Sequence, residues 1–162
     1  MKPILEEDIF LIANQQTRKS KSPKSLRMAQ LTDEHLILPT GPHGLRSTLN
    51  AAFARANVTP QVILEIDSLA MLMDAVRSGL GATLQPWAAV ARMRDAQDQL
   101  YMARISDHKV KRLNFLCGLS DDELSPAALA ARVVLTDCMK SLVQSGVWQG
   151  AVLSEPSPPH IA

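Results

Sequence analysis

The sequence is poor in cysteine, in net charge and in long apolar runs, and each shortage argues against a class of protein. Cys117 and Cys138 form no CxxC pair and have no adjacent histidine, so neither a zinc site nor a redox motif is indicated, and both are expected to be buried thiols in a reducing cytosol. A formal net charge of +1 gives no global reason to expect nucleic-acid or membrane binding. No run of about 18 apolar residues exists, so no membrane span is expected.

The first residues also lack the apolar segment of a secretion signal. They carry Glu6, Glu7 and Asp8 instead, so we expect a cytoplasmic protein with no membrane partner. A length of 162 residues suits one ordinary domain or two very small ones, and an apolar content of 46% is enough for a buried core. No residue pattern indicates a cofactor or a metal site.

What the sequence does contain is a series of short apolar runs between residues 36 and 86. The runs are Leu36–Leu38, Val62–Ile66 and Ala82–Leu84, and the last of them leads directly into Pro86. Each is aliphatic or β-branched and too short to favour a free helix. They predict three buried strands.

Two amphipathic stretches separate these runs and predict helices. Apolar residues recur at three- and four-residue steps over 43–57, and again after Asp67 or Ser68, either of which would cap the second helix before it ends at Gly79. The order strand, helix, strand, helix, strand is typical of a parallel α/β sheet with right-handed crossovers.

Ligands of such sheets bind where the carboxyl ends of the strands meet the helix N-termini. The two turns at this edge are residues 40–46 and 67–69. Their free N–H groups and positive dipole ends favour an anion, and Arg46 would bind a carboxylate through its fork of donors. The alternative is that Gly41 and Gly44 only permit the turn and that Arg46 is a solvated charge.

The residues before this stretch predict one strand and one loop. Ile9–Ala13 is an unbroken apolar run, which predicts a strand buried on both faces, although the eight residues before it cannot supply its neighbours. Residues 14–30 are basic, rich in serine and free of acid, which favours a solvated loop over a nucleic-acid contact. After the central stretch, a short helix is predicted over 86–94 and a turn over 95–99.

The last third predicts two strands, over 100–105 and 110–119, and a long helix. Ser125, followed by proline, starts the helix, which should run to Ser145 and stop at Gly146. Its apolar stripe is expected to lie on a sheet, and the opposite face is expected to meet water. The stripe comprises Ala127, Ala131, Val134, Leu135, Cys138 and Leu142. The residues expected to face solvent are Arg132, Thr136, Asp137, Lys140 and Gln144.

Four successive segments resemble one known family. They are Leu36-Ile37-Leu38-Pro39, Gly44-Leu45-Arg46, Glu65-Ile66-Asp67-Ser68 and VRSGLGATLQP at 76–86. In this order they are similar to the effector-binding domain of LysR-type transcriptional regulators, over roughly residues 5–148. The resemblance implies a periplasmic-binding-protein-like (type II) α/β fold, in which two crossing strands join two subdomains.

The resemblance also implies a division of the chain. Residues 1–25 would be a remnant of the first subdomain with a crossing strand and the basic loop, 26–105 a complete Rossmann-like second subdomain, 106–150 the return to the first, and 151–162 a flexible tail. The family's winged helix-turn-helix, linker helix and opening βαβ units have no counterpart here. We therefore expect an N-terminally truncated member that contacts DNA only through a domain absent from this chain and that associates as a homo-oligomer.

The function implied is a sensory one, without catalysis. A small organic anion, such as a carboxylate, would bind between the subdomains and control transcription. Thr40 and Ser68 would hydrogen-bond to it, Arg46 would pair with its charge, and Asp67 would rather cap its helix. The effector-binding set carried over from the family is Thr40, His43, Arg46, Asp67, Ser68 and Thr83.

Two other functions fit the same residues less well. A solute-binding transport protein of the same fold is disfavoured because no secretion signal is present. A small hydrolase using Ser68, His43 and Asp67 is disfavoured because the sequence contains no G-x-S-x-G elbow and because Asp67 and Ser68 are direct neighbours.

Overall fold

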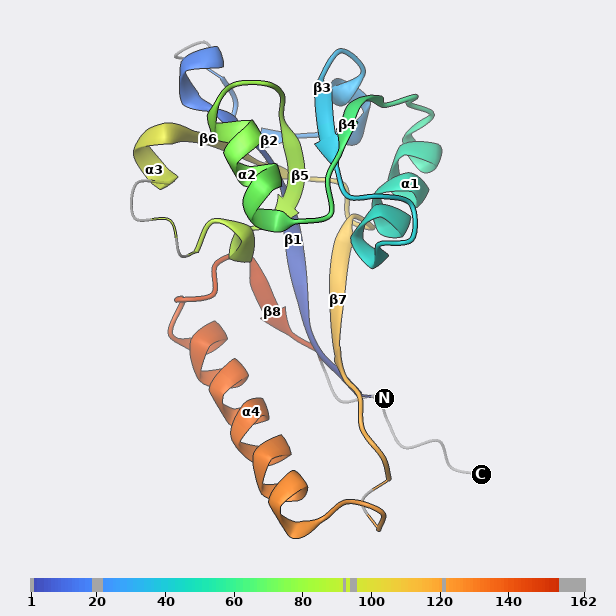
Figure 1. The fold of residues 1–162 in the computed structure, drawn as a ribbon, viewed down its shortest axis with the longest axis vertical. Helices are drawn as coiled ribbons and strands as arrows, with labels where there is room; N and C mark the ends of the chain where they lie inside the picture. The colour runs from blue at the N-terminus through green and yellow to red at the C-terminus, as the bar shows by residue number, and fades with distance from the viewer. Residues whose placement is uncertain (1, 19–21, 92, 94–95, 121, 155–162) are drawn as a thin grey trace. The chain divides into compact units, whose positions relative to one another are not determined.

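The computed structural model describes residues 2–18, 22–91, 93, 96–120 and 122–154 (Figure 1). Contacts divide the chain into two units. Unit 1 contains the residues up to Glu7 and those from Leu113 onward, and unit 2 runs from Asp8 to Arg112. Two strands, β1 (Lys2–Asn14) and β7 (Lys111–Leu116), each include the point at which the chain passes from one unit to the other.

The sheet of unit 2 has the order β2-β6-β1-β5, from β2 (Ser25–Leu26), β6 (Leu100–Ile105), β1 and β5 (Thr83–Pro86). Strand β1 is antiparallel to β5 and β6, and β2 is parallel to β6. Next to this sheet, β3 (His35–Leu38) and β4 (Gln61–Glu65) form a parallel pair. A parallel bridge from Leu36 to Ala82 connects β3 to the start of β5. The three strands predicted from the apolar runs are therefore present and parallel to one another.

The two predicted helices of this unit are α1 (Gly44–Ala56) and α2 (Leu69–Arg77). The His43 side chain caps α1, and Ser68 caps α2. The first helix ends at Asn57, which adopts the left-handed conformation with φ of 57°, and the second is followed by Gly79 with φ of 80°. The capping and stop signals in the sequence thus predicted both ends of α2, and the apolar spacing predicted the extent of α1.

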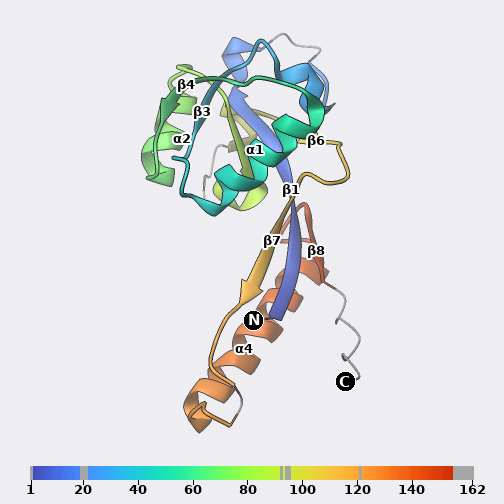
Figure 2. The same cartoon turned by 90° about the vertical axis from the view of Figure 1, so that its right-hand side faces the viewer.

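Strand β3 shows why a continuous apolar run was needed here. Successive side chains of a strand point to opposite faces of the sheet. Leu36 and Leu38 belong to the core cluster that contains the apolar face of α1, whereas Ile37 belongs to the cluster that contains the apolar face of α2. Helices therefore cover both faces of the sheet at β3, as Figure 2 shows from the side.

Two strand predictions in this unit need correction. Ile9–Ala13 was expected to lack neighbours, yet it lies between β5 and β6, because strands that come later in the sequence supply both neighbours. The run Val62–Ile66 was expected to be buried, but Ile63 and Leu64 are 45% and 42% exposed. The reason is that β4 pairs with β3 alone among the described strands and is an edge.

Residues 14–30 are more ordered than a solvated loop. They include the 3-10 helices η1 (Gln15–Thr17) and η2 (Met28–Leu31) as well as β2. Arg18 makes two hydrogen bonds of 2.7 Å to the Glu34 carboxylate and lies over the Tyr101 ring. The hydrogen bond to Glu34 raises the pKa of Arg18, although partial burial of the guanidinium acts in the opposite direction. Residues 19–21 lie outside the described residues.

The segment between β5 and β6 also differs from expectation. Where a helix was predicted over 86–94, the described part contains the 3-10 helix η3 (Trp87–Ala89), and residues 92, 94 and 95 lie outside the described residues. Where a turn was predicted, α3 (Ala96–Gln99) forms a single helical turn.

Unit 1 is built from the first part of β1, from the later part of β7, from α4 (Pro126–Gln144) and from β8 (Ala151–Leu153). Both β7 and β8 pair with β1, the latter in antiparallel register. Ser125 caps α4, and Gly146 follows its end with φ of 74°, as predicted. In the segment 151–162, which was expected to be a flexible tail, residues 151–153 form β8 and residues 155–162 lie outside the described part.

Helix α4 exposes the stripe that was expected to be buried. Val134 and Leu135 are 60% and 53% exposed, and Ala127, Ala131, Cys138 and Leu142 are exposed as well. The half-buried residues include Arg132 and Thr136, which were predicted to face water. Both cysteines are free and exposed, so the prediction of buried thiols is wrong. The physical reason for the stripe, which includes Cys138, is that nothing among the described residues covers this face of α4.

A buried carboxylate joins three segments of unit 1. Glu7 is 2% exposed, and its Oε1 accepts a hydrogen bond of 2.8 Å from Trp148 Nε1. Its Oε2 accepts one of 2.7 Å from Asn114 Nδ2. Strand β1 is thereby tied to β7 and to the segment after α4. No helix among the described residues is long and apolar enough to cross a membrane.

Candidate functional site

The two turns predicted to hold a ligand are hydrogen-bonded to each other. Because β3 and β4 are parallel neighbours, their carboxyl ends meet at one edge of the sheet. There the Asp67 carboxylate accepts bonds of 2.9 Å from the Thr40 backbone N–H and from the Thr40 hydroxyl. These bonds lower the pKa of Asp67 below its ordinary value. The turn before α1 is thus fixed against the turn before α2.

Asp67 and Ser68 divide their roles differently from the expectation that Asp67 caps its helix. Ser68 Oγ accepts from the Met71 N–H at 3.5 Å and is the N-cap of α2. Asp67 is instead bonded to Thr40. Of the two residues predicted as possible caps of α2, Ser68 is confirmed. Asp67 instead links the two turns.

His43 begins α1 and is a structural cap in this state. Its Nδ1 accepts a hydrogen bond of 3.2 Å from the Leu45 N–H, one of the donors that a helix N-terminus leaves unpaired. The rest of the imidazole is exposed beside the turn.

Arg46 is neither a solvated charge nor a free ligand-binding fork. Its side chain is 13% exposed, and its Nη1 donates to the Pro39 carbonyl at 2.8 Å and to Glu65 Oε1 at 2.6 Å. Its Nε donates to Asn50 Oδ1 at 3.0 Å. Arg46 therefore joins the ends of β3 and β4 to α1. Its Nη2 group has no hydrogen-bond partner among the residues that the structure describes.

Thr83 differs from the other predicted site residues because it is buried. It is 0% exposed and lies opposite Ile12 of β1 in the sheet register. Its Oγ1 is buried and unpaired within the described part of the chain. The structure thus brings Thr40, Asp67 and Ser68 to one exposed edge, and it places Thr83 inside the sheet.

Sequence reasoning missed the partners of Arg46. Asn50 follows it by four residues, a spacing that places both side chains on one face of a helix and could have revealed that contact. Glu65 was noted only as part of a motif. Its role depends on the register of β3 and β4, which the sequence does not state.

The arrangement contains no catalytic triad. Ser68, His43 and Asp67 are each bonded to other groups, and no hydrogen bond among the described residues joins them to one another. The same part of the chain holds no group of three or more potential metal ligands. What the edge offers is a pair of helix N-termini with exposed polar side chains.

Comparison with known proteins gives a consistent result. The family model described as the LysR substrate binding domain matches residues 1–139. The nitrogen assimilation regulatory protein nac of Klebsiella aerogenes is 30% identical over 133 residues, which are 82% of this chain and 42% of that protein. The protein of the same name from Escherichia coli K12 is 28% identical over 147 residues, 90% of this chain and 47% of that protein. The chain thus spans less than half the length of these regulators.

Solved structures support the fold. The effector binding domain of QuiR in complex with shikimate matches with a TM-score of 0.71 and 18% identity, over 86% of this chain and 65% of that one. The regulatory domain of Synechocystis PCC6803 CcmR in complex with 2-PG matches with a TM-score of 0.70 and 21% identity, over 87% of this chain and 67% of that one. The predicted α/β fold of the periplasmic-binding-protein-like type II class is confirmed.

Proposed function

Because the chain belongs to the LysR substrate-binding domain family, we propose that it is the effector-sensing part of a LysR-type transcriptional regulator. In this proposal a small organic anion binds at the edge formed by the turns before α1 and α2. Its binding then changes transcription through the DNA-binding part of the whole regulator. The relatives are regulators rather than enzymes, which supports a sensory role over a catalytic one.

The observation that carries the proposal is the connection between the two turns. Thr40 and Asp67 hold two helix N-termini at one sheet edge. Helix N-termini favour negative charge because their first N–H groups are unpaired and their dipoles are positive. A ligand at this edge would contact the N-termini of both α1 and α2, and the two turns would not have to approach each other before it binds.

Each predicted residue has a specific part in the proposal. Ser68 and His43 lie at the edge with exposed polar side chains. Thr40 belongs to the turn before α1 and holds it to Asp67. Arg46 contributes its remaining Nη2 donors, while Glu65 neutralises much of its charge. Thr83 makes contact only if the strand end opens to admit the ligand, because its hydroxyl is buried.

A calorimetric titration tests the class of effector. The chain is titrated with mono- and dicarboxylates and with neutral sugars, and we expect a carboxylate to bind and sugars to fail. Arg46→Ala should weaken carboxylate binding by about 1.5–3 kcal/mol, the range for a hydrogen bond to a charged group. Arg77→Ala is the matched control, because Arg77 is exposed in the last turn of α2, at the other end of that helix. Binding of sugars alone, or equal losses in both variants, would refute the proposed site.

A further inference from the structure

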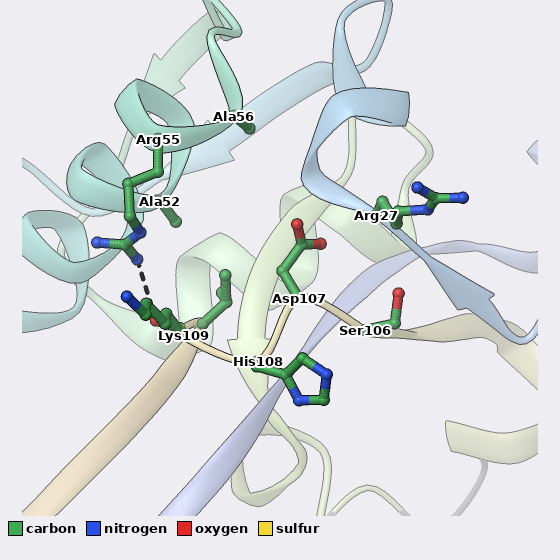
Figure 3. A pocket seen from close by; sticks show the side chains of 9 residues that line it. Arg27, Ala52, Arg55, Ala56, Ser106, Asp107, His108 and Lys109 are labelled. Atoms are coloured by element: carbon green, nitrogen blue, oxygen red, sulfur yellow. Dashed lines mark hydrogen bonds between the residues drawn. The ribbon is translucent and has the colours of Figure 1, made fainter.

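A cavity lies in unit 2, at the opposite end of α1 from the turns that hold the proposed effector. Its volume is about 520 Å³, within the range of small-molecule sites. The two ends of α1 are roughly 18 Å apart at 1.5 Å per residue, so one small ligand cannot touch both places. The cavity is lined by Arg27, Ala52, Arg55, Ala56, Ser106, Asp107, His108, Lys109 and Val110 (Figure 3).

The charged residues of this cavity come from three separate elements. Arg27 precedes η2, Arg55 lies in the last turn of α1, and Lys109 belongs to the loop between β6 and β7. None of the three has a carboxylate partner within the described residues. Arg55 donates to a neutral group, the Lys109 carbonyl, at 3.0 Å. Three cationic side chains thus border one cavity without counter-charges of their own.

Several other cations of the same unit are paired with carboxylates. Arg18 binds Glu34, Arg46 binds Glu65, and both Arg104 and Lys111 bind Asp8. Lys24 and Arg112 also have no ion pair among the described residues, but they do not line the cavity, so what distinguishes the cavity is that three unpaired cations gather around it. Arg55 alone could be explained as a complement to the negative end of the α1 dipole. That explanation does not extend to Arg27 and Lys109, which lie on other elements.

One carboxylate enters the cavity and limits what can bind there. Asp107 Oδ2 accepts the Met28 N–H at 2.9 Å, which holds η2 to the β6–β7 loop. Figure 3 shows Asp107 between Arg27 on one side and Arg55 on the other. Three positive charges against one negative charge leave an excess of two. A ligand that balances this excess carries two negative charges.

The floor of the cavity is apolar. Ala52 is 2% exposed and Val110 is 3% exposed, whereas the charged groups stand at the exposed rim. A low-dielectric floor strengthens the attraction between the rim cations and an anion above it. The volume of the cavity suits a small molecule and not a nucleic-acid duplex.

We propose that this basic cavity, defined by Arg27, Arg55, Lys109 and the floor beneath them, is a binding site for a small dianion such as a phosphate group or a dicarboxylate. The site is separate from the proposed effector edge and does not depend on it. Its occupant would connect η2, α1 and the loop that leads into β7, one of the two strands along which the chain leaves unit 2.

The test uses the full chain and two probes, inorganic phosphate and succinate, titrated at constant ionic strength and followed by the backbone amide signals of residues 106–110. We expect saturable shifts with at least one probe. The double variant R27Q/K109Q should weaken binding about tenfold or more, since each lost charged contact is worth at least that factor. Lys24→Gln is the control, because Lys24 is exposed in the same unit and does not line the cavity.

A second variant should change the binding affinity in the opposite direction. Asp107→Asn keeps an oxygen to accept the Met28 N–H and removes the one negative charge of the cavity. It should tighten binding several-fold, an outcome that a merely structural role of Asp107 would not produce. The proposal is overturned if neither probe saturates, if R27Q/K109Q binds as the parent does, or if Asp107→Asn weakens binding. It is also overturned if Arg46→Ala, at the far edge, abolishes the shifts while the cavity variants do not.

Discussion

Replacing Arg46 should reveal that it supports the sheet edge. Arg46→Ala removes the donor to the Pro39 carbonyl, which costs about 1–3 kcal/mol when an acceptor loses its partner. It also removes the pair with Glu65, which is 47% exposed and therefore worth at most about 1 kcal/mol. We expect the free energy of unfolding to fall by about 2–3 kcal/mol. Glu65→Gln removes only the charge and should cost about 0.5 kcal/mol.

Urea unfolding followed by tryptophan fluorescence can measure this difference in unit 2 alone. Trp87 lies in unit 2 and Trp148 in unit 1, so a Trp148→Phe background leaves one reporter in the relevant unit. Arg77→Ala removes only exposed contacts, an ion pair with Asp74 and hydrogen bonds to Gln99, and should cost no more than about 1 kcal/mol. If Arg46→Ala has no larger effect than Arg77→Ala, Arg46 is not a structural link. If Glu65→Gln costs as much as Arg46→Ala, the ion pair and not the carbonyl contact dominates.

Four further predictions concern other parts of the fold. Glu7→Gln should lower the unfolding free energy by about 1–3 kcal/mol in thermal melts, because one of its two buried acceptor oxygens becomes an NH₂ group that faces a donor. Gly81→Ala should cost about 1–3 kcal/mol, because its Cβ would lie 2.8 Å from a backbone oxygen of β3, whereas Gly41→Ala, with no atom within 4 Å, should be neutral. Folding lowers the pKa of Asp67, so its ionised carboxylate stabilises the fold fully above the unfolded pKa of about 3.9, and this stabilisation is lost as the pH falls below that value. In an acid titration of stability, Thr40→Val should therefore lose less stability than the parent chain. The exposed apolar stripe of α4 should make the chain associate, so light scattering should give a mass that rises with concentration, and a concentration-independent monomer would contradict this.

Local patterns predicted the central part of unit 2 well. Each strand run, helix period, cap and stop between Leu36 and Pro86 depends on residues within a few positions of one another. His43, Ser68 and Gly79 accordingly begin or end helices where the sequence indicated. The turns of the candidate site followed from the same local signals together with the general rule for parallel strands.

The errors occurred where the outcome depends on a distant partner. A periodic stripe tells which face of a helix is apolar, but it does not tell whether another element covers that face, and so the stripe around Val134 and Leu135 was wrongly taken as buried. Ile63 and Leu64 show the same limit for a strand, because their exposure follows from the edge position of β4. The pairing of Arg46 likewise depends on strand register.

The position of β1 also has a consequence for the order of folding. Phe10 pairs with Gln85 on one side and with Arg104 on the other, so its neighbours lie 75 and 94 residues further along the chain (85 − 10 and 104 − 10). Contacts between residues so far apart in sequence slow folding, because the loop must close before they stabilise the structure. A chain emerging from the ribosome would thus present the apolar run Ile9–Ala13 unpaired until β5 and β6 had been synthesised. During synthesis this strand is therefore exposed to aggregation and to chaperone binding.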